Sequence, residues 1–396
     1  MKKILFAIGI VALLLTEILR VYFIMPFPGS QQQNSIALAY AIHQHIFWIR
    51  SVGIILIAYP AFYFLFQHKG QVGRWVVAGL LLLYMVIAYL FNFKFLADKM
   101  FYQPGSIVFA GSAHNIIPTS NLVLGVYLNG RAKAYPIEII GYHHQVRDTL
   151  GEIPLMITYC TVCRTGRVYS PVVDGNPEEF RLVGMDHFNA MFEDKSTGSW
   201  WRQVNGEAIV GKRKGKVLTE IPSEQVSLEA WLEQYPAAVI LQPDSTFSEQ
   251  YKGLSKFDEG KSKGSLTRRD SLSWKEKSWV VGVQLGRMSR AYDWNDLIRA
   301  RVINDTLANI PIAIVVEHDS ASFHVFRRDL YSFSKDAYSE TLTDSPTSSV
   351  WNFRGYCTDG PLKGSQLTKI QSYQEFWHSW RTFHPRTSQF ILQKSD

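Results

Sequence analysis

The first hundred residues contain three long apolar stretches with few charges. They run from about residue 4 to 25, 46 to 66 and 75 to 93. A helix rises about 1.5 Å per residue, so each stretch is long enough to cross a hydrocarbon core about 30 Å thick. The first stretch is too long for the apolar part of a signal peptide, and no small-residue cleavage motif follows it before Pro26. We therefore predict a membrane anchor over residues 1–98 with three transmembrane helices.

Positive charges beside these stretches predict their orientation. Lys2 and Lys3 precede the first, and Lys69 and Arg74 separate the second from the third, whereas residues 26–45 contain no lysine or arginine. Short cytoplasmic segments are enriched in these residues, so three crossings leave everything after about residue 100 outside the cytoplasm. The sequence thus predicts a multi-pass protein of the bacterial inner membrane that contacts the lipid bilayer and has a periplasmic C-terminal region.

Three charged residues, Glu17, Arg20 and Arg50, lie within or near the spans. Charges inside a membrane often mark transport. Glu17 and Arg20 stand three apart on one helix face and can pair, and Arg50 can extend toward a span end. We expect structural pairing, because three spans make a poor transporter.

After residue 98 the pattern changes to short alternating runs separated by turn residues, which favours strands. Asn129-Gly130 is a strong hairpin signal. We predict strands over residues 121–127, 132–135, 154–159 and 167–173, helices over 227–235 and 373–383, and a polar loop or mobile flap over 251–277. The fold class is therefore α+β, with a β-rich extracytoplasmic region after the three helices.

Part of this region recurs later in the chain at a constant offset of 157 residues (282 − 125). Gly125, Val126, Leu128, Ala134, Tyr135, Asp148, Thr149, Leu150, Ile153, Pro154 and Ile157 return as Gly282, Val283, Leu285, Ala291, Tyr292, Asp305, Thr306, Leu307, Ile310, Pro311 and Ile314. We predict an internal duplication, with a first repeat over 99–250, a polar loop over 251–278, and a second repeat with a C-terminal segment over 279–396. Residues that both copies keep are interpreted as scaffold, and residues that only one copy has are candidates for chemistry.

Cys160 and Cys163 occur in the first copy only, in a predicted turn between two strands. Thioredoxin-like proteins place such a pair at the start of a helix, which this sequence does not predict here. Two sulfurs in a turn resemble half of a zinc knuckle. The metal hypothesis takes Cys160, Cys163 and His143 as ligands, with His144 and His187 as further candidates. Thiolate and imidazole together favour copper or zinc as the cofactor.

Two other hypotheses use the same cysteines. Outside the cytoplasm they could form a disulfide, and its very small ring would be strained and easily reduced, as in a thiol–disulfide oxidoreductase. Alternatively, the cysteines brace a turn in a non-catalytic binding or assembly module. The sequence leaves all three open, so it does not decide whether the protein is an enzyme.

Other candidates have simpler structural interpretations. Asp148 is matched by Asp305 in the cysteine-free copy, so a turn role is simpler than a base. Trp200 and Trp201 could stack a sugar, but adjacent strand residues face opposite ways, so one should be core. His187 with Asp186 is a polar cluster that could face the cysteines. Glu317-His318-Asp319, which replaces Cys160-Thr161-Val162 in the second copy, should form a surface turn.

Charge and missing motifs exclude several functional classes. The net charge is +7, and many basic residues lie between residues 252 and 277. No nucleic-acid reader motif accompanies them, so we expect a solvated loop and no nucleic-acid partner. The sequence also lacks H-E-x-x-H, G-x-S-x-G and a phosphate-binding glycine loop, which argues against zincins, serine hydrolases and common nucleotide enzymes.

The region around the cysteines resembles the bacterial family defined by the domain of unknown function numbered three-one-seven-nine. The likeness rests on Ala-Tyr-Pro at 134–136, on His143 and on the motif Thr158-Tyr-Cys-x-x-Cys163, and it continues through residues 191–211, 351–364 and Phe376-Trp-His-Ser-Trp380. This chain has Thr161-Val162 and Arg164 where members have Pro-Leu and Gly, His144 is an addition, and Cys357 replaces a small residue. The resemblance implies an architecture and a cysteine site without a reaction.

Overall fold

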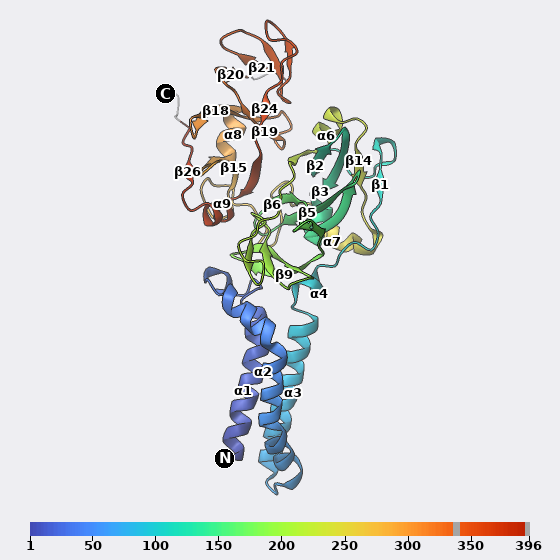
Figure 1. Cartoon of the computed structure of the whole chain (residues 1–396), viewed down its shortest axis with the longest axis vertical. Coiled ribbons are helices and arrows are strands. Elements are labelled where there is room, and N and C mark those ends of the chain that lie inside the picture. Colours follow the sequence, from blue (N-terminus) through green and yellow to red (C-terminus); the bar gives the residue numbers. More distant parts are fainter. Residues whose placement is uncertain (336–340, 393–396) are drawn as a thin grey trace. The chain divides into compact units, whose positions relative to one another are not determined.

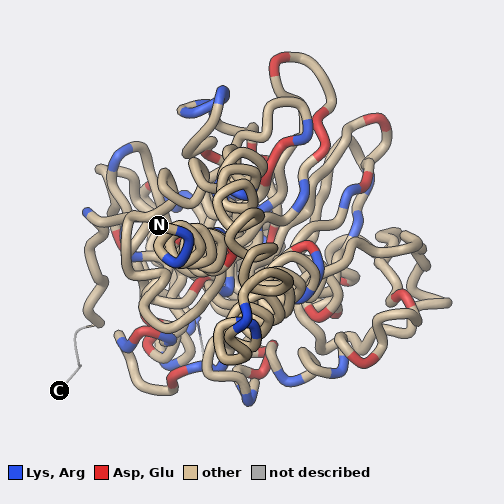
Figure 2. The backbone as a smooth tube through the Cα atoms, turned by 90° about the horizontal axis from the view of Figure 1, so that it is seen from below, with Lys and Arg blue, Asp and Glu red and all other residues tan. Residues whose placement is uncertain are grey.

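Three long apolar helices open the chain: α1 (Lys2–Tyr22), α2 (Ile36–Phe62) and α3 (Gln71–Phe93) (Figure 1). The computed structural model describes residues 1–335 and 341–392. By length and composition each of the three helices can cross a membrane. Their tubes carry few charges (Figure 2), and they present exposed apolar side chains such as Trp48 and Leu82. The prediction of three apolar helices before a β-rich α+β region is confirmed.

The chain divides into two units. Unit 1 joins residues 1–102 to 178–217, and unit 2 joins 103–177 to 218–396. Besides α1–α3, unit 1 contains α4 (Ala97–Met100) and an antiparallel sheet of β9 (Phe180–Asp186), β10 (Asn189–Asp194), β11 (Trp200–Arg202) and β12 (Ala208–Val210).

The second helix begins at Ile36, earlier than the predicted start near residue 46. Its first turns contact the sheet of unit 1, since the ring of Tyr40 meets Trp200 and His43 lies 3.1 Å from Glu193. We expected one of Trp200 and Trp201 to lie in the core, but both are buried. Neither tryptophan offers an open face on which a sugar could stack.

The charged residues of the helices are paired, although Glu17 has a different partner from the one predicted. Arg50 donates two hydrogen bonds of 2.6 Å to the Glu17 carboxylate, across α1 and α2. Asn92 of α3 also donates to Glu17, and it accepts a bond from Arg20. Arg50 lies on a neighbouring helix and can approach the Glu17 carboxylate end on. Arg20, on the same helix as Glu17, binds the side-chain amide of Asn92 instead. The cluster ties the three helices together.

Unit 2 contains two sets of elements in the same order. The first set is β2 (Leu122–Leu128), β3 (Arg131–Pro136), α5 (Ile137–His143), β4 (Gln145–Leu150), β5 (Ile153–Cys160) and β6 (Thr165–Tyr169). The second is β15 (Trp279–Leu285), β16 (Met288–Asp293), α8 (Trp294–Ala300), β17 (Val302–Leu307), β18 (Ile310–Val316) and β19 (Phe323–Arg327). The first residues of β2 and β15, and of β4 and β17, differ by 157 (279 − 122 and 302 − 145). This correspondence is what the predicted duplication requires.

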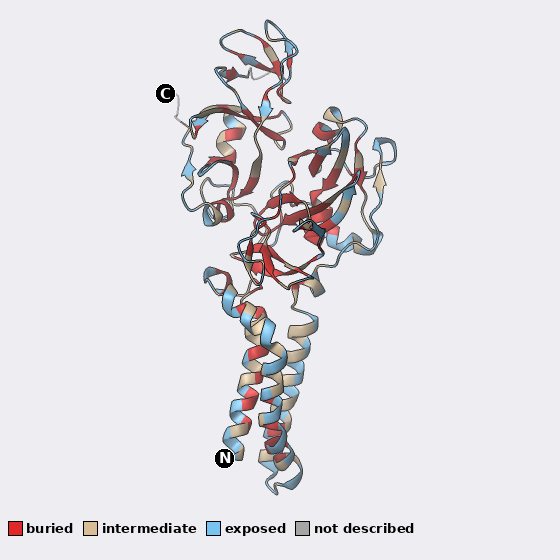
Figure 3. Cartoon of the chain, viewed as in Figure 1, coloured by how far each residue is buried: buried red, intermediate tan, exposed pale blue. Residues whose placement is uncertain are grey.

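Each set is completed by a later strand, helix and strand. β13 (Glu224–Ser227), α6 (Leu228–Gln234) and β14 (Val239–Leu241) join the first set, in a sheet ordered β1-β14-β3-β2-β13 with β1 at Phe109–Ala110. β25 (Ser372–Phe376), α9 (Trp377–Phe383) and β26 (Ser388–Gln389) join the second, in a sheet ordered β25-β15-β16-β26. The inner faces of these strands form the core of unit 2 (Figure 3).

The remaining strands are short. β7 (Val172–Val173) pairs with β8 (Asn176–Pro177), and β24 (Thr368–Lys369) extends the sheet β17-β18-β19. A further sheet contains β20 (Phe333–Ser334), β21 (Thr341–Asp344), β22 (Val350–Asn352) and β23 (Cys357–Asp359).

Matched contacts explain several of the recurring residues. The indole of Trp231 lies against Gly125, and that of Trp380 lies against Gly282, so closely that neither glycine has room for a Cβ atom. Asp148 and Asp305 each accept a 2.7 Å hydrogen bond from a tyrosine hydroxyl, of Tyr135 and Tyr292 respectively. Each aspartate lies within a strand, not in the predicted turn, and its bond links strands of two different sheets, β3 to β4 and β16 to β17.

Two local predictions are confirmed by the structure, and one changes. The hairpin at Asn129-Gly130 and the helix near 227–235 are confirmed as β2–β3 and α6. The helix predicted over 373–383 begins only at Trp377, because Ser372–Phe376 pairs with β15 as strand β25. Sheet pairing overrides the helical spacing of aromatic residues there.

The polar segment contains one short helix, α7 (Ser248–Leu254), and turns from residue 255 to 278. It is less solvated than predicted. Phe257 is 1% exposed and Lys277 is largely buried, since both pack against the cysteine turn of the first set. The segment therefore acts as a cover over that turn.

Candidate buried dithiol site

The two cysteines lie at the end of one β-hairpin. Cys160 is the last residue of β5 and pairs with Thr165, the first residue of β6. The turn between them closes at Arg164, whose φ of 56° lies in the left-handed region. The two cysteines are not joined in a disulfide, and both are completely buried. The predicted strand–turn–strand setting is confirmed, and the turn brings the two thiols together.

Cys163 interacts with both Cys160 and the second set of elements. Its thiol is hydrogen-bonded to Cys160 and to the hydroxyl of Ser379 in α9. The backbone N–H of Phe376 donates to the Cys163 carbonyl oxygen over 3.0 Å. The pKa of the Cys163 thiol is raised well above its ordinary value, mainly by burial and to a smaller extent by the hydrogen bond to Cys160 and the charge of Cys160. In this closed arrangement the thiol is protonated and unreactive.

A chain of polar groups leads away from Cys163. Ser379 Oγ donates to Glu375 Oε2 over 2.8 Å, and Arg167 of β6 donates to Glu375 Oε1 over 2.5 Å. Because the serine proton points to Glu375, its oxygen can accept the proton of the Cys163 thiol. Glu375 and Arg167 are both buried, and each neutralises the other. The chain is a possible proton path from thiol to carboxylate.

A part-buried lysine lies on the other side of the turn. Lys277 Nζ donates to the carbonyl oxygens of Val162 and Leu266, at 2.6 Å each. Burial lowers the pKa of Lys277, while the nearby Cys163 and Cys160 act to raise it. His378 Nε2 lies 3.2 Å from the same Val162 carbonyl, and burial lowers the pKa of this imidazole to about 3. His378 is therefore neutral and donates to that carbonyl.

The cover over the turn leaves several buried groups without partners. Arg164 stacks on Trp279 at 3.8 Å and donates to Gln374 and to the carbonyl of Phe257. Within the described residues, no hydrogen-bond partner exists for Arg164 Nη2, Tyr159 Oη or Asp258 Oδ1. Burial raises the pKa of Asp258 to about 6, and the charge of Arg164 opposes this. A buried polar group without a partner costs about 1–3 kcal/mol, so these atoms are the least stabilised polar groups around the turn.

The predicted histidine ligands lie elsewhere. His143 Nε2 is 2.7 Å from the hydroxyl of Tyr251, and its ring contacts Phe247. His144 is buried, which lowers its pKa to about 4, and its backbone carbonyl pairs with Tyr159. His187 belongs to unit 1 and lies 2.6 Å from Asp186. Over residues 1–335 and 341–392, no three His, Cys, Asp or Glu side chains gather as a metal site, so His143 does not complete one with the cysteines.

The second set has no equivalent site. Glu317, where the first set has Cys160, is buried and bonds to His324 at 2.6 Å. His318 is exposed, and Asp319 accepts backbone N–H bonds in its own turn. We predicted that Glu317-His318-Asp319 forms a surface turn, but only part of it is exposed, since Glu317 is buried and His318 is exposed. Cys357 is buried in β23, where its thiol donates to the Asp359 carbonyl over 3.3 Å.

Sequence reasoning missed four residues around the cysteines: Lys277, Glu375, His378 and Ser379. One signal was available, because the Phe376–Trp380 segment carries part of the family resemblance. Its role follows only from the fold, since β25 and α9 lie more than 200 residues after the cysteines (372 − 163). The second set of elements, which has no such cysteine pair, thus contributes β25 and α9 to the surroundings of Cys163.

A family model described as "Protein of unknown function (DUF3179)" matches residues 104–387. This range contains the cysteine turn, the covering segment and β25–α9. No curated protein and no solved structure matches the chain.

Proposed function

Because the chain belongs to the DUF3179 family, whose function is unknown, no activity comes with the family, and we propose that Cys160 and Cys163 form a thiol–disulfide redox centre. The observation that carries the proposal is a pair of buried, mutually hydrogen-bonded thiols, not joined in a disulfide, with a part-buried lysine and a Ser379–Glu375 chain beside them. This setting combines proton transfer with charge stabilisation, as thiol exchange requires.

The proposed reaction reduces a disulfide of a partner molecule. Cys163 loses its proton through Ser379 to Glu375, and its thiolate attacks one sulfur of the partner disulfide. The partner releases one thiolate, which takes up a proton. Cys160 then attacks the Cys163 sulfur of the mixed disulfide, the bond from Cys163 to the partner breaks, and the departing second partner thiolate takes up the proton that Cys160 gives up. The net change is one partner disulfide reduced to two thiols and one Cys160–Cys163 disulfide formed.

Access requires the covering segment to move, because both sulfurs are buried. The unpaired groups Arg164 Nη2, Tyr159 Oη and Asp258 Oδ1 favour this movement, since opening would let water satisfy them. Opening also removes the burial that keeps Cys163 protonated. The segment would therefore couple exposure of the thiols to their activation.

Redox titration of the full-length protein in detergent tests the proposal. Equilibration with reduced and oxidised dithiothreitol, followed by alkylation and mass spectrometry, should reveal a reversible loss of two thiols linking Cys160 to Cys163. Cys163→Ser should abolish the transition, whereas Cys357→Ser, a matched buried cysteine, should leave it unchanged. A pair that stays reduced under strongly oxidising conditions, also after Phe257→Ala loosens the cover, would refute the proposal.

A second candidate, copper(I) binding, is favoured by one observation. Copper(I) accepts two thiolate ligands, and the resulting unit carries one negative charge. Lys277 interacts electrostatically with both cysteines and would neutralise that charge. Zinc prefers four ligands, which these residues do not supply.

Copper(I) and zinc can be compared by titrating the reduced protein anaerobically with each metal. Copper(I) binding predicts one metal per chain, lost in Cys160→Ser and kept in His143→Ala. Absence of copper(I) binding, together with a normal redox transition, would leave only the thiol–disulfide function.

The same proposal includes a location. We propose that α1–α3 anchor the chain in a bacterial inner membrane with unit 2 outside the cytoplasm, on the basis of the basic residues before α1 and between α2 and α3. Alkaline phosphatase fused after Asp396 should then be active, and green fluorescent protein at the same site should be dark. The opposite pair of results would reverse the orientation.

A further inference from the structure

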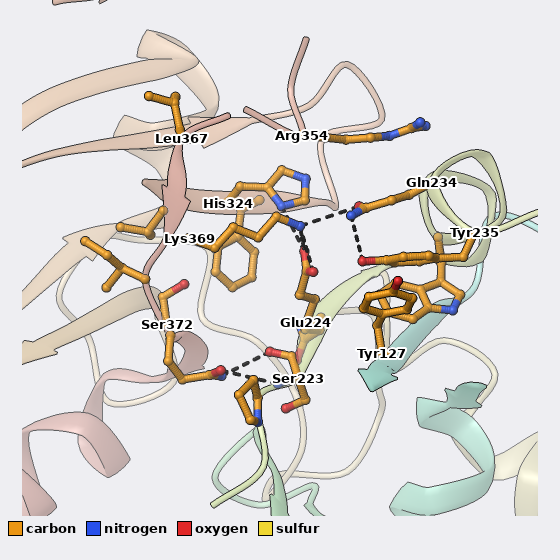
Figure 4. A pocket seen from close by; sticks show the side chains of 18 of the residues that line it. Tyr127, Ser223, Glu224, Gln234, Tyr235, His324, Arg354, Leu367, Lys369 and Ser372 are labelled. Carbon is orange, nitrogen blue, oxygen red and sulfur yellow. Dashed lines mark hydrogen bonds and ion pairs between the residues drawn. The ribbon is translucent and has the colours of Figure 1, made fainter. Parts of the chain in front are cut away.

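Unit 2 contains a cleft that is separate from the dithiol site. Its cavity measures about 820 Å³ and is lined by residues of β2, β13 and α6 on one side and β19 and β24 on the other (Figure 4). Ligand pockets in proteins typically measure about 300–1,000 Å³. The cleft is thus large enough for a small organic molecule of several rings.

Aromatic rings line one wall of the cleft. Tyr127 and Tyr235 (Figure 4) stack with their centroids 4.6 Å apart and their planes 19° apart. The ring of Trp231 contacts Tyr235, with the two centroids 4.5 Å apart. Tyr127 is 46% exposed, and Tyr356, another residue of the lining, is 45% exposed. A tyrosine held by stacking offers a flat apolar surface at little entropic cost.

The charges in the cleft neutralise one another. Lys369 Nζ lies 2.6 Å from Glu224 Oε2, which also lies 3.2 Å from His324 Nδ1 (Figure 4). His324 Nε2 is in turn 2.6 Å from Glu317 Oε1. Burial alone would lower the pKa of His324, but Glu224 and Glu317 raise it overall. Glu224 remains ionised, because His324 and Lys369 overcome the effect of burial and lower its pKa to about 2. Arg354, a further charged residue of the lining, lies 2.9 Å from the Glu233 carboxylate, so each positive group of the cleft has a carboxylate partner.

A charged ligand would have to disrupt these pairs, whereas a neutral polar ligand would not. The lining also contains amide groups, from Gln225, Gln234, Asn352 and Gln371. Each already makes hydrogen bonds within the protein, for example Gln371 to the backbone of Ser223, but an amide has two donor hydrogens and two acceptor lone pairs, so part of each remains for a ligand. Amides both donate and accept hydrogen bonds, as sugar hydroxyls do. A pyranose ring also has an apolar C–H face that packs on an aromatic ring.

We propose that this cleft binds a neutral oligosaccharide, with one sugar ring on the exposed face of Tyr127 and its hydroxyls on the surrounding amides. The combination of a rigid tyrosine stack, amide groups and internally paired charges carries the assignment. The site is independent of the cysteines, so it gives the protein a recognition function beside the proposed redox centre.

Binding is tested with the full-length protein in a detergent that contains no sugar. The probes are maltotriose, cellotriose, mannotriose and triacetylchitotriose, with trigalacturonic acid as an acidic sugar and triglycine as a neutral peptide. Saturation-transfer NMR and calorimetry should detect at least one neutral trisaccharide. Tyr127→Ala should weaken its binding about tenfold or more, and Tyr127→Phe should retain it.

Matched variants separate this site from other surfaces. Tyr102→Ala removes a tyrosine of similar exposure (51%) from unit 1 and should not change binding, and neither should Cys160→Ser. The proposal fails if no neutral trisaccharide binds, if binding survives both Tyr127→Ala and Tyr356→Ala, or if trigalacturonic acid or triglycine binds more tightly.

Discussion

Replacing Glu375 with alanine should destabilise unit 2 by about 3–5 kcal/mol, because it leaves the guanidinium of Arg167 buried without its carboxylate. Ser379 also loses its acceptor, which disturbs the hydrogen bond to Cys163. For a domain of this size the melting temperature should fall by an amount on the order of 10 °C. Thermal unfolding of the full-length protein, followed by tryptophan fluorescence, measures the change.

Two control variants test the cause of this loss. Glu249→Ala breaks the exposed pair with Lys252 and should change stability by less than about 1 kcal/mol. The double variant Arg167→Met with Glu375→Leu should recover part of the loss, since it removes both buried charges together. If Glu375→Ala melts at the wild-type temperature, the buried pair does not contribute as described.

Replacing Trp380 with alanine should cost a similar amount, about 3–5 kcal/mol, through the cavity that it leaves. Trp380 is fully buried, its ring stacks on His384 at 3.7 Å, and its Nε1 donates to Thr387 over 2.8 Å. The indole also lies directly on Gly282 in β15, so its loss removes contacts between α9 and the sheet. The melting temperature again reports the effect, with exposed Leu330→Ala as the control.

A double-mutant cycle identifies the contact between Trp380 and Gly282. Gly282→Ala alone should destabilise the protein by about 1–3 kcal/mol, because its new Cβ atom collides with the indole. In a Trp380→Ala background the same substitution should cost much less. Equal costs in both backgrounds would show that the indole does not determine which residue fits at position 282.

The local elements that follow from short-range patterns could be predicted well. The three apolar helices, the hairpin at Asn129-Gly130 and the turn that holds Cys160 and Cys163 are determined by periodicity and turn residues close together in the chain. The strand at Ser372–Phe376 was missed, because its conformation depends on pairing with β15 about ninety residues earlier. Glu17 was assigned to Arg20 for the same reason, since spacing along one helix does not describe the neighbouring helix that supplies Arg50.

The candidate site shows the same division. The cysteine pair is visible in the sequence because both residues lie in one turn, and their absence from the second copy distinguishes them from the scaffold. The interpretation of the second copy as a mere control was incomplete, however. Its strand β25 and helix α9 bring Glu375 and Ser379 to Cys163, and its strands β19 and β24 bring His324 and Lys369 to Glu224.

By itself, therefore, the sequence determined the apolar helices, the recurrence of residues at an offset of 157 and the position of the dithiol. Only the tertiary structure decided which groups surround that dithiol, that His143 does not join it, and that a cleft forms beside Glu224. The physical reason is range: hydrophobic periodicity and turn chemistry act over a few residues, whereas burial and charge pairing depend on segments that meet only after folding.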